Sequence, residues 1–292
     1  MIPLTHCKNK KIFVLGLGLS GESAIRALES GGANVSAWDD NDRVRKNYFE
    51  QGKIITNPKE ISVKDFDVLF LSPGIDIKKS PQKKFIDEFM RKKKTIICDI
   101  QLFVDEISHR KRNDKIIMLT GTNGKSTTSM MIYHILDKLG KKVQVGGNIG
   151  SRGVLDFELS DQDITFIIEL SSYQIELSPN IKPDIGILLN ISPDHLDRHG
   201  DMDKYIDIKF DIFKHQNEDD ISIIGLDGEI VSSEIKKRNF ESNLISYKNN
   251  PQDGNEIAEL HVDGEVSRYD LSLIHISEPT RPERISYAGV GV

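Results

Sequence analysis

The segment that most restricts the fold of this chain is a loop, Gly-Thr-Asn-Gly-Lys-Ser-Thr, at positions 121–127. An apolar run at Ile116–Leu119 precedes it and a helical pattern at Lys125–Leu139 follows it, which predicts a strand, a tight turn and a helix in succession. Two glycines in such a turn allow backbone N–H groups to point inward at phosphate oxygens, and the helix N-terminus adds its positive dipole end. The loop therefore predicts a site for a nucleoside triphosphate.

The side chains of this loop have distinct expected roles. Lys125 would neutralise the β and γ phosphates, and the hydroxyl of Ser126 or Thr127 would hold Mg²⁺. An ordinary glycine-rich turn is the alternative, but it explains neither the Lys-Ser pair nor the flanking strand and helix. The expected nucleotide-binding residues are Gly121, Thr122, Asn123, Gly124, Lys125, Ser126 and Thr127.

Strands and helices alternate along the chain in two blocks. The first block has expected strands at Ile12–Leu15, Asn34–Trp38, Val68–Leu71 and Thr95–Cys98 and helices at Ser20–Ser30 and Pro81–Arg91. The second has expected strands at Ile116–Leu119, Lys142–Val145, Ile164–Glu169, Asp184–Leu189 and Ile221–Gly225 and helices at Lys125–Leu139 and Met202–His215. This alternation predicts an α/β protein with parallel sheets and crossover helices.

The two blocks set the expected domain boundaries. The charged stretch Ser108–Lys115 is the expected linker, so we expect one domain over residues 1–108 and a second over residues 109–270. Beyond Asp253 the alternation weakens, and Leu271–Arg281 resembles the in-frame translation of a sequencing-library adapter. We therefore expect a non-native tail over residues 271–292, in preference to an ordinary irregular C-terminus.

Composition excludes several classes of protein. A net charge of −6 argues against a nucleic-acid binder, since a phosphate backbone requires concentrated Lys and Arg. No run approaches the roughly 20 apolar residues that span a bilayer. The two cysteines, Cys7 and Cys98, lack metal-type spacing and are expected to be reduced thiols. A cytoplasmic monomer without membrane or nucleic-acid partners is the expectation.

A second glycine motif lies near the N-terminus. Gly16-Leu-Gly-Leu-Ser-Gly21 follows an expected strand, and Asp39 and Asp40 close the next strand about 20 residues later. This pattern alone predicts NAD binding. Its physical basis is only that a helix N-terminus receives a diphosphate, and a UDP-linked substrate carries a diphosphate equally well.

The common phosphate loop has the pattern Gly-x-x-x-x-Gly-Lys-Ser, but here Leu119 stands at the position of its first glycine. The resulting shorter spacing resembles the one shared by Mur ligases and folylpolyglutamate synthases. Other segments resemble Mur ligases in particular, and the resemblance covers Lys11 to about Ser246. These segments are Gly146-Gly-Asn-Ile-Gly150, Glu169-Leu-Ser-Ser-Tyr-Gln174, Asp194-His-Leu-Asp-Arg-His199, Ser72-Pro-Gly-Ile75 and Asp99-Ile-Gln-Leu-Phe103. The resemblance implies an N-terminal Rossmann-like UDP-binding domain and a central P-loop ATPase-type α/β domain, with the family's C-terminal Rossmann-like domain missing.

The resemblance also implies roles for individual residues. The implied catalytic residues are Lys125, Asn148, His195 and Lys209, and the implied ligands of two Mg²⁺ ions are Ser126, Glu169, His195 and Lys209, the last as a carbamate. The implied substrate-binding residues are Leu19, Ser20, Asp39, Asp40, Ser72, Pro73, Gly74, Ile75, Asn148, Ser171 and Gln174. Without the resemblance, we would expect Glu169 to be a surface charge at a strand end. We would likewise expect His195 to be a structural histidine and Lys209 to be an exposed lysine on a helix.

The implied activity is ATP-dependent amide formation through an acyl phosphate. The pattern is closest to the family member that joins D-glutamate to UDP-N-acetylmuramoyl-L-alanine in peptidoglycan synthesis. Because the third domain is expected to be missing, we expect no complete ligation by this chain alone. The alternatives are another Mur ligase, a ligase like folylpolyglutamate synthase, an NAD-linked oxidoreductase, and a nucleotide-binding module without enzymatic activity.

Overall fold

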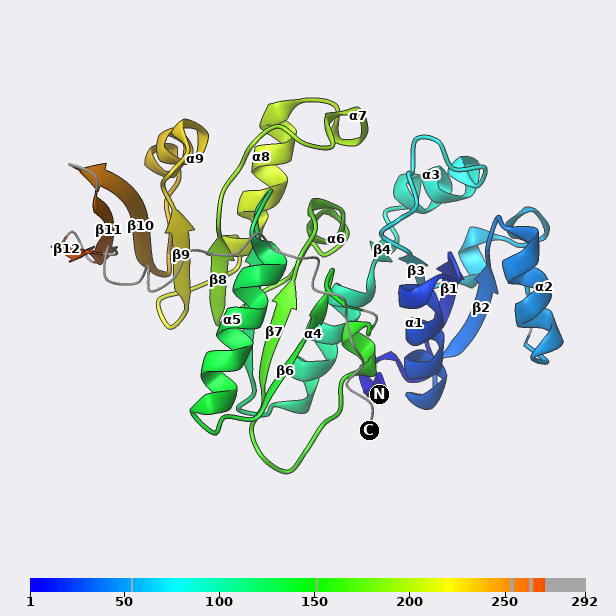
Figure 1. Cartoon of the computed structure of the whole chain (residues 1–292). Coiled ribbons are helices and arrows are strands. Elements are labelled where there is room, and N and C mark those ends of the chain that lie inside the picture. The colour runs from blue at the N-terminus through cyan, green and yellow to red at the C-terminus, as the bar shows by residue number, and fades with distance from the viewer. Residues whose placement is uncertain (54, 151, 253–254, 263–264, 271–292) are drawn as a thin grey trace.

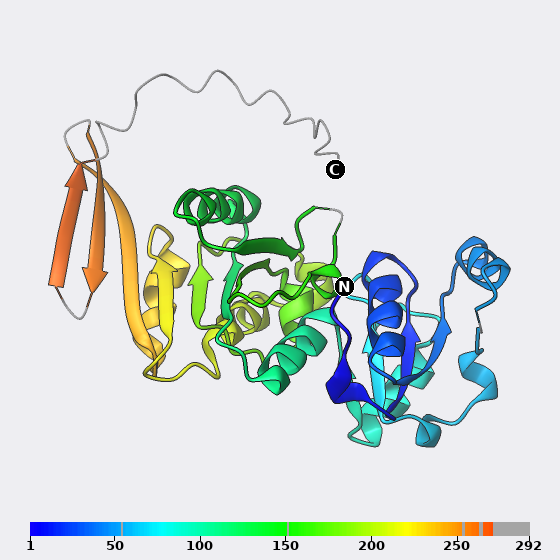
Figure 2. The ribbon, with the colours of Figure 1, turned by 90° about the horizontal axis from the view of Figure 1, so that it is seen from below.

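The computed structural model describes residues 1–53, 55–150, 152–252, 255–262 and 265–270 (Figure 1). These residues form two sheets, one with strand order β2-β1-β3-β4 and one with order β12-β11-β10-β9-β8-β5-β7-β6. The sheets lie side by side, as Figures 1 and 2 show from two directions. The expected non-native tail, residues 271–292, lies outside the described residues.

The first sheet is parallel throughout and carries the N-terminal glycine motif. Its elements are β1 (Lys11–Leu15), α1 (Leu19–Ser30), β2 (Asn34–Trp38), α2 (Asp42–Glu50), β3 (Val68–Leu71), α3 (Lys83–Arg91) and β4 (Thr95–Ile97). Strands β1 and β3 are almost wholly buried, which explains their continuous apolar runs. The chain adds β2 on one side of β1 and β3 on the other, so a crevice is expected at the carboxyl ends of β1 and β3.

The second sheet is parallel from β6 to β10 and antiparallel from β10 to β12. Its strands are β5 (Lys115–Thr120), β6 (Val143–Gly147), β7 (Thr165–Glu169), β8 (Ile185–Leu188), β9 (Ile221–Gly225), β10 (Asn243–Gln252), β11 (Asn255–Val262) and β12 (Glu265–Asp270). Its helices are α5 (Lys125–Lys138), α6 (Ser172–Glu176), α7 (Leu196–His199), α8 (Met202–Phe210) and α9 (Glu229–Glu234). Strand β5 lies between β7 and β8, which makes its carboxyl end the switch point of this sheet.

The predicted α/β class with parallel sheets is confirmed, but the structure differs from two local expectations. The expected helix Met202–His215 ends at Phe210 and continues as a 3₁₀ turn at Asp211–Phe213. Strands β10–β12 were not expected, because this stretch mixes Asn, Pro, Gly and charged residues with few apolar ones.

The expected linker Ser108–Lys115 is regular structure only at its two ends, and Lys111–Asp114 joins them as a turn and irregular backbone. Helix α4 (Asp99–Arg110) extends into its start and β5 begins at its last residue. Two of its basic residues, His109 and Arg110, end α4, a largely buried helix in which the ring of Phe103 packs edge-on against Phe157 and Phe166. The expected boundary at residue 108 therefore falls inside α4.

The N-terminal segment connects the two sheets. The backbone N–H of Ile2 donates to the carbonyl of Leu155 (2.9 Å), beside the second sheet, and that of Leu4 donates to Ala27 on α1 (3.0 Å). Both apolar side chains are fully buried. One hydrophobic core accordingly runs without interruption through both halves of the molecule.

Gly21 tests how tightly the N-terminal loop packs. A Cβ at this position would lie 1.8 Å from the carbonyl oxygen of Gly16, so Gly21→Ala must displace backbone. We expect the substitution to lower the free energy of unfolding by about 3 kcal/mol, measured by urea denaturation. Gly18→Ala is the matched control, since its Cβ would meet no described atom within 4 Å. Equal stability of the two variants would contradict the packing.

Candidate functional site

The triphosphate loop lies where the carboxyl ends of β5, β7 and β8 meet. Asn190, just beyond β8, holds the first half of the loop, because its Oδ1 accepts the N–H groups of Thr122 (3.1 Å) and Asn123 (2.9 Å). Gly124 adopts a φ of 81°, which favours glycine at the turn into α5. The N–H groups of Thr122 and Asn123 are thus occupied within the protein, whereas the first N–H groups of α5 lack intrahelical partners and can donate to a ligand. Sequence reasoning did not identify Asn190, although it follows an expected strand.

The two site lysines converge on one backbone oxygen. The Nζ of Lys125 donates to the carbonyls of Gly121 and Thr122, both at 3.0 Å, so the side chain is folded back over its own loop. The Nζ of Lys209 donates to the carbonyl of Gly121 as well (3.0 Å). Phosphate oxygens bound at this loop would offer Lys125 an anionic partner in place of these carbonyls.

Lys209 is buried, not exposed as the alternative interpretation of the sequence had it. Its side chain is 2% exposed and also lies 3.3 Å from the hydroxyl of Thr120. Burial, together with the nearby charge of Lys125, lowers the pKa of Lys209 to about 7. A substantial fraction of this amine is therefore neutral and nucleophilic near neutral pH.

Glu169, Ser126 and Asn148 come together at the end of β7. The carboxylate of Glu169 accepts hydrogen bonds from the hydroxyl of Ser126 (2.7 Å) and from the side-chain amide of Asn148 (3.1 Å). Glu169 is only 1% exposed, so the reading as a surface charge is wrong. No basic side chain of the described residues forms an ion pair with it, and a buried carboxylate without a cation is costly. A hydroxyl and a carboxylate oxygen in contact are the donor set that Mg²⁺ prefers, so these residues fit the ion.

His195 lies on a neighbouring loop in an unusual backbone conformation. Its φ is 51°, which is uncommon for a residue with a Cβ and is often found at functional sites. Its ring lies 5.2 Å from that of Tyr173, and its Nε2 lies 3.4 Å from Asp194. Among the residues that the structure describes, no three His, Cys, Asp or Glu side chains form a metal-holding group, so Glu169 and His195 are not brought together in such a cluster.

The two predicted substrate-binding residues of α6 bond to each other. Ser171 caps the helix, and the Oε1 of Gln174 accepts both the N–H and the hydroxyl of Ser171 at 3.0 Å. This reciprocal capping box fixes the turn that follows Glu169.

The remaining predicted substrate residues gather at the carboxyl ends of the first sheet. The carboxylate of Asp39 accepts the N–H of Leu17 (2.7 Å), which shapes the glycine loop. That of Asp40 accepts from the indole of Trp38 (3.0 Å) and from Gln82 (2.7 Å). The other members of this group, on the loop into α1 and on the loop after β3, are Leu19, Ser20, Ser72, Pro73, Gly74 and Ile75.

The crevices of the two sheets are neighbours. The Nζ of Lys78, on the loop after β3, donates to the carbonyl of Arg198 in α7 (2.9 Å). Lys79 on the same loop lies 4.0 Å from Asp197. These contacts join the predicted UDP-binding edge to the loop that carries His195.

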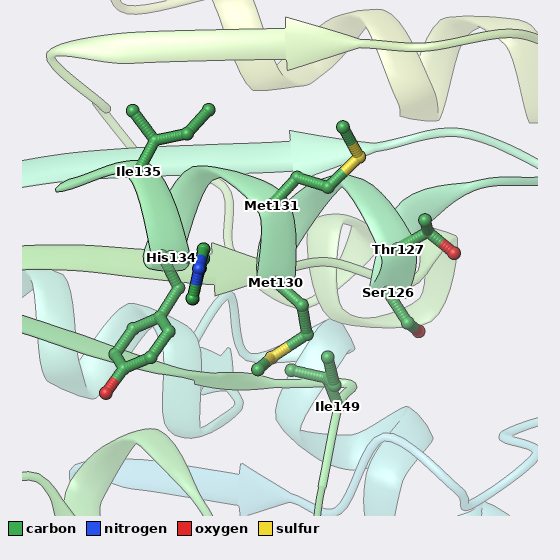
Figure 3. A pocket seen from close by; sticks show the side chains of 8 residues that line it. Ser126, Thr127, Met130, Met131, His134, Ile135 and Ile149 are labelled. Atoms are coloured by element: carbon green, nitrogen blue, oxygen red, sulfur yellow. The ribbon is translucent and has the colours of Figure 1, made fainter. Parts of the chain in front are cut away.

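An apolar cavity of about 600 Å³ continues from the triphosphate loop along α5 (Figure 3). Ser126 and Thr127 line one end, and Figure 3 shows Met130 beside Ile149 at one wall. The outer face of α5 is unusually apolar, since Met131 is 60% and Ile135 is 56% exposed. Within the described residues, no helix is long and apolar enough to cross a membrane.

The lowered pKa of Lys209 predicts a pH-dependent stability. Unfolding restores its ordinary pKa of 10.5, so between about pH 7 and pH 10 the unfolded chain binds more protons than the folded chain. The penalty of burying Lys209 is complete below about pH 7 and fades as the pH rises. We expect the free energy of unfolding of Lys209→Met minus that of the wild-type chain to decrease between about pH 6 and pH 9, measured by urea denaturation. A constant difference would contradict the shift.

Comparison with known proteins gives consistent matches. The family model described as Mur ligase middle domain matches residues 119–286. A UDP-N-acetylmuramoylalanine--D-glutamate ligase of Caulobacter sp. (strain K31) is 41% identical over 231 residues, which cover 78% of this chain and 49% of that protein. One from Wolbachia pipientis wMel is 41% identical over 251 residues, covering 85% and 47% respectively. The chain thus spans about half the length of the curated relatives it matches.

Among solved structures, a UDP-N-acetylmuramate:L-alanyl-gamma-D-glutamyl-meso-diaminopimelate ligase from Neisseria meningitides matches with a TM-score of 0.55. The match covers 89% of this chain and 86% of that chain at 16% sequence identity. At this identity the likeness shows a shared fold.

Proposed function

This chain belongs to the Mur ligase family, and we propose that it takes part in the ATP-dependent joining of D-glutamate to UDP-N-acetylmuramoyl-L-alanine, a step of peptidoglycan precursor synthesis. The observation that carries the proposal is the convergence of Lys125, Ser126, Glu169, Asn148 and Lys209 at the carboxyl edge of one sheet. The relatives that are about 41% identical carry the name of this ligase.

The chemistry requires an activated carboxylate, because a carboxylate is a poor electrophile for an amine. A carboxylate oxygen of the UDP-linked substrate attacks the γ phosphorus of ATP, and the bond from that phosphorus to the bridging oxygen breaks to release ADP. The amine of D-glutamate then attacks the acyl carbon, and inorganic phosphate leaves with the electron pair of the broken C–O bond as the amine loses a proton. The phosphoryl transfer of the first step requires positive charge around the moving group.

The residues of this chain can supply that charge and position the reactants. Lys125 exchanges its backbone partners for the β and γ phosphates, and the start of α5 contributes N–H donors. Asn148 and His195 help to position the acceptor carboxylate. Ser126, Glu169, His195 and Lys209 would hold two Mg²⁺ ions, which when bound neutralise phosphate charge.

For Lys209 we propose the carbamate that the family resemblance implies. The neutral amine nitrogen bonds to the carbon of CO₂, one C=O π pair moves onto oxygen, and the nitrogen releases a proton to solvent. The product is an anionic carbamate, which offers oxygen ligands in place of the amine. The low pKa of Lys209, about 7, supports this step because only the neutral amine reacts. Burial beside the loop then places the new oxygens near the triphosphate site.

The first sheet would hold the UDP portion of the substrate at its glycine loop, with Asp39, Asp40 and the loop after β3 around it. The carboxylate oxygens of Asp39 accept one backbone N–H group each, from Leu17 and Asn41, and keep further acceptor positions, so Asp39 does not distinguish UDP from the NAD of an oxidoreductase. In the dinucleotide fingerprint an acidic residue at this position binds a ribose hydroxyl. Contact between the two sheets through Lys78 favours a substrate that reaches across both crevices.

Nucleotide binding tests the triphosphate loop of the second sheet. We expect Lys125→Ala to weaken binding of ATP with Mg²⁺ at least about tenfold in isothermal titration, because a charge-assisted bond to phosphate is lost. Lys138→Ala, at the exposed far end of α5, should bind like the wild-type chain. Equal affinities of Lys125→Ala and the wild-type chain would remove the basis of the proposal.

The fluorescence of Trp38 can report on ligand binding at the first sheet, because Trp38 is the single tryptophan of the chain and its indole donates to Asp40. We expect UDP-N-acetylmuramoyl-L-alanine to quench its fluorescence saturably and free UDP to compete. NADH should have no saturable effect. A response to NADH alone would favour the oxidoreductase over the ligase.

A further inference from the structure

The one-turn helix α7, which follows His195, has a single buried anchor. His199 is 2% exposed, whereas Leu196 is 36% exposed and Asp197 is also exposed. The backbone is left-handed on both sides of the helix, at His195 (φ 51°) and at Gly200 (φ 103°). So short a helix with such flanks has little regular structure to fix its orientation. The buried side chain of His199 shares this role with two contacts of Arg198, whose carbonyl accepts from Lys78 and whose guanidinium stacks on Tyr173 (3.7 Å to the ring centroid).

The contacts of His199 are specific. Its Nε2 lies 2.8 Å from the hydroxyl of Ser172, and its ring packs between those of Tyr173 (centroids 5.2 Å apart) and Tyr205 (5.5 Å). Its Nδ1 is buried without a hydrogen-bond partner among the described residues, with the carboxylate of Glu176 3.9 Å away. An unsatisfied buried nitrogen is costly, so an aromatic hydrocarbon would fill this space at lower free energy. The polar bond to Ser172 is what such a replacement would lack.

This bond joins two loops that carry separate functional groups. Ser172 follows Glu169 by three positions at the end of β7, and His199 lies one helical turn after His195. The N–H of His199 also donates to the carbonyl of His195 (3.2 Å), so the buried ring and the exposed ring belong to one rigid turn. A displacement of His199 from Ser172 would therefore move His195.

We propose that His199 is a positioning residue, which fixes the His195 turn relative to Glu169 through its bond to Ser172. The part of this inference that concerns metal rests on the proposed function. Tyr205 extends the same support to the triphosphate loop, because its hydroxyl lies 3.3 Å from that of Thr122. Groups that orient metal ligands commonly change metal affinity about 10- to 100-fold when they are lost.

The positioning role is tested first without metal, by hydrogen–deuterium exchange of the 292-residue chain. Ser172→Ala and His199→Phe both remove the bond, and His199→Phe keeps the aromatic packing. Ser222→Ala is the matched control, a buried serine bonded to Gln216 (2.7 Å) and Ser242 (2.6 Å). We expect faster exchange confined to residues 196–200 in the first two variants and absent from the control. Unchanged exchange there, or an equal rise throughout the chain, would overturn the inference.

Metal binding is tested second, with Mn²⁺ as the probe in the presence of ADP, followed by electron paramagnetic resonance. We expect about tenfold weaker Mn²⁺ binding in Ser172→Ala and in His199→Phe, with no further loss in the double variant. His199→Gln, whose amide can reach Ser172, should restore most of the affinity, and ADP affinity without metal should not change. A wild-type chain that binds no Mn²⁺ would count against the proposed function, whereas the exchange result decides the positioning role by itself.

Discussion

The carbonyl oxygen of Gly121 accepts hydrogen bonds from two lysines, and much of the site is organised by this crowding of positive charge. Lys125 reaches it from the start of α5 and Lys209 from α8, each at 3.0 Å. Two ammonium groups so close to each other repel, and the burial of Lys209 adds to the cost. This repulsion is reduced when one amine loses its charge or when an anion binds. The two lysines thus place positive charge at the loop before any ligand binds, and this charge suits a triphosphate.

The negative charge of the site, the carboxylate of Glu169, lies apart from the lysines on the same edge of the sheet. Glu169 is buried at the end of β7, and its oxygens face a hydroxyl and an amide, which satisfy hydrogen bonding but do not neutralise charge. A magnesium-bound nucleotide presents both kinds of partner, an anion for the lysines and a cation for the carboxylate. The complementarity arises because neighbouring parallel strands end at a common edge, which brings together residues far apart in sequence.

The sequence predicted the elements whose periodicity and flanking residues agree, such as the strand before Gly121 and the helix after it. It predicted the roles of Glu169 and Lys209 only through family resemblance, because a lone carboxylate or lysine carries no sign of its burial. Asn190, Ser172 and Tyr205 were missed for a related reason, since their importance lies in contacts made across the fold. The predicted linker was drawn too long, because a charged helix end and a connecting loop have the same composition.

The N-terminal residues give the molecule a further property. Ile2 is hydrogen-bonded to a segment beside the second sheet and Leu4 to a helix of the first, and a common core lies beneath both. A hinge rotation of one sheet against the other would have to break these bonds and expose apolar surface. The N-terminal segment and the shared core therefore oppose a change in the separation between the glycine loop at Gly16 and the triphosphate loop at Gly121. A single molecule bound at both loops would have to span this separation, so its length would matter as well as its chemical groups.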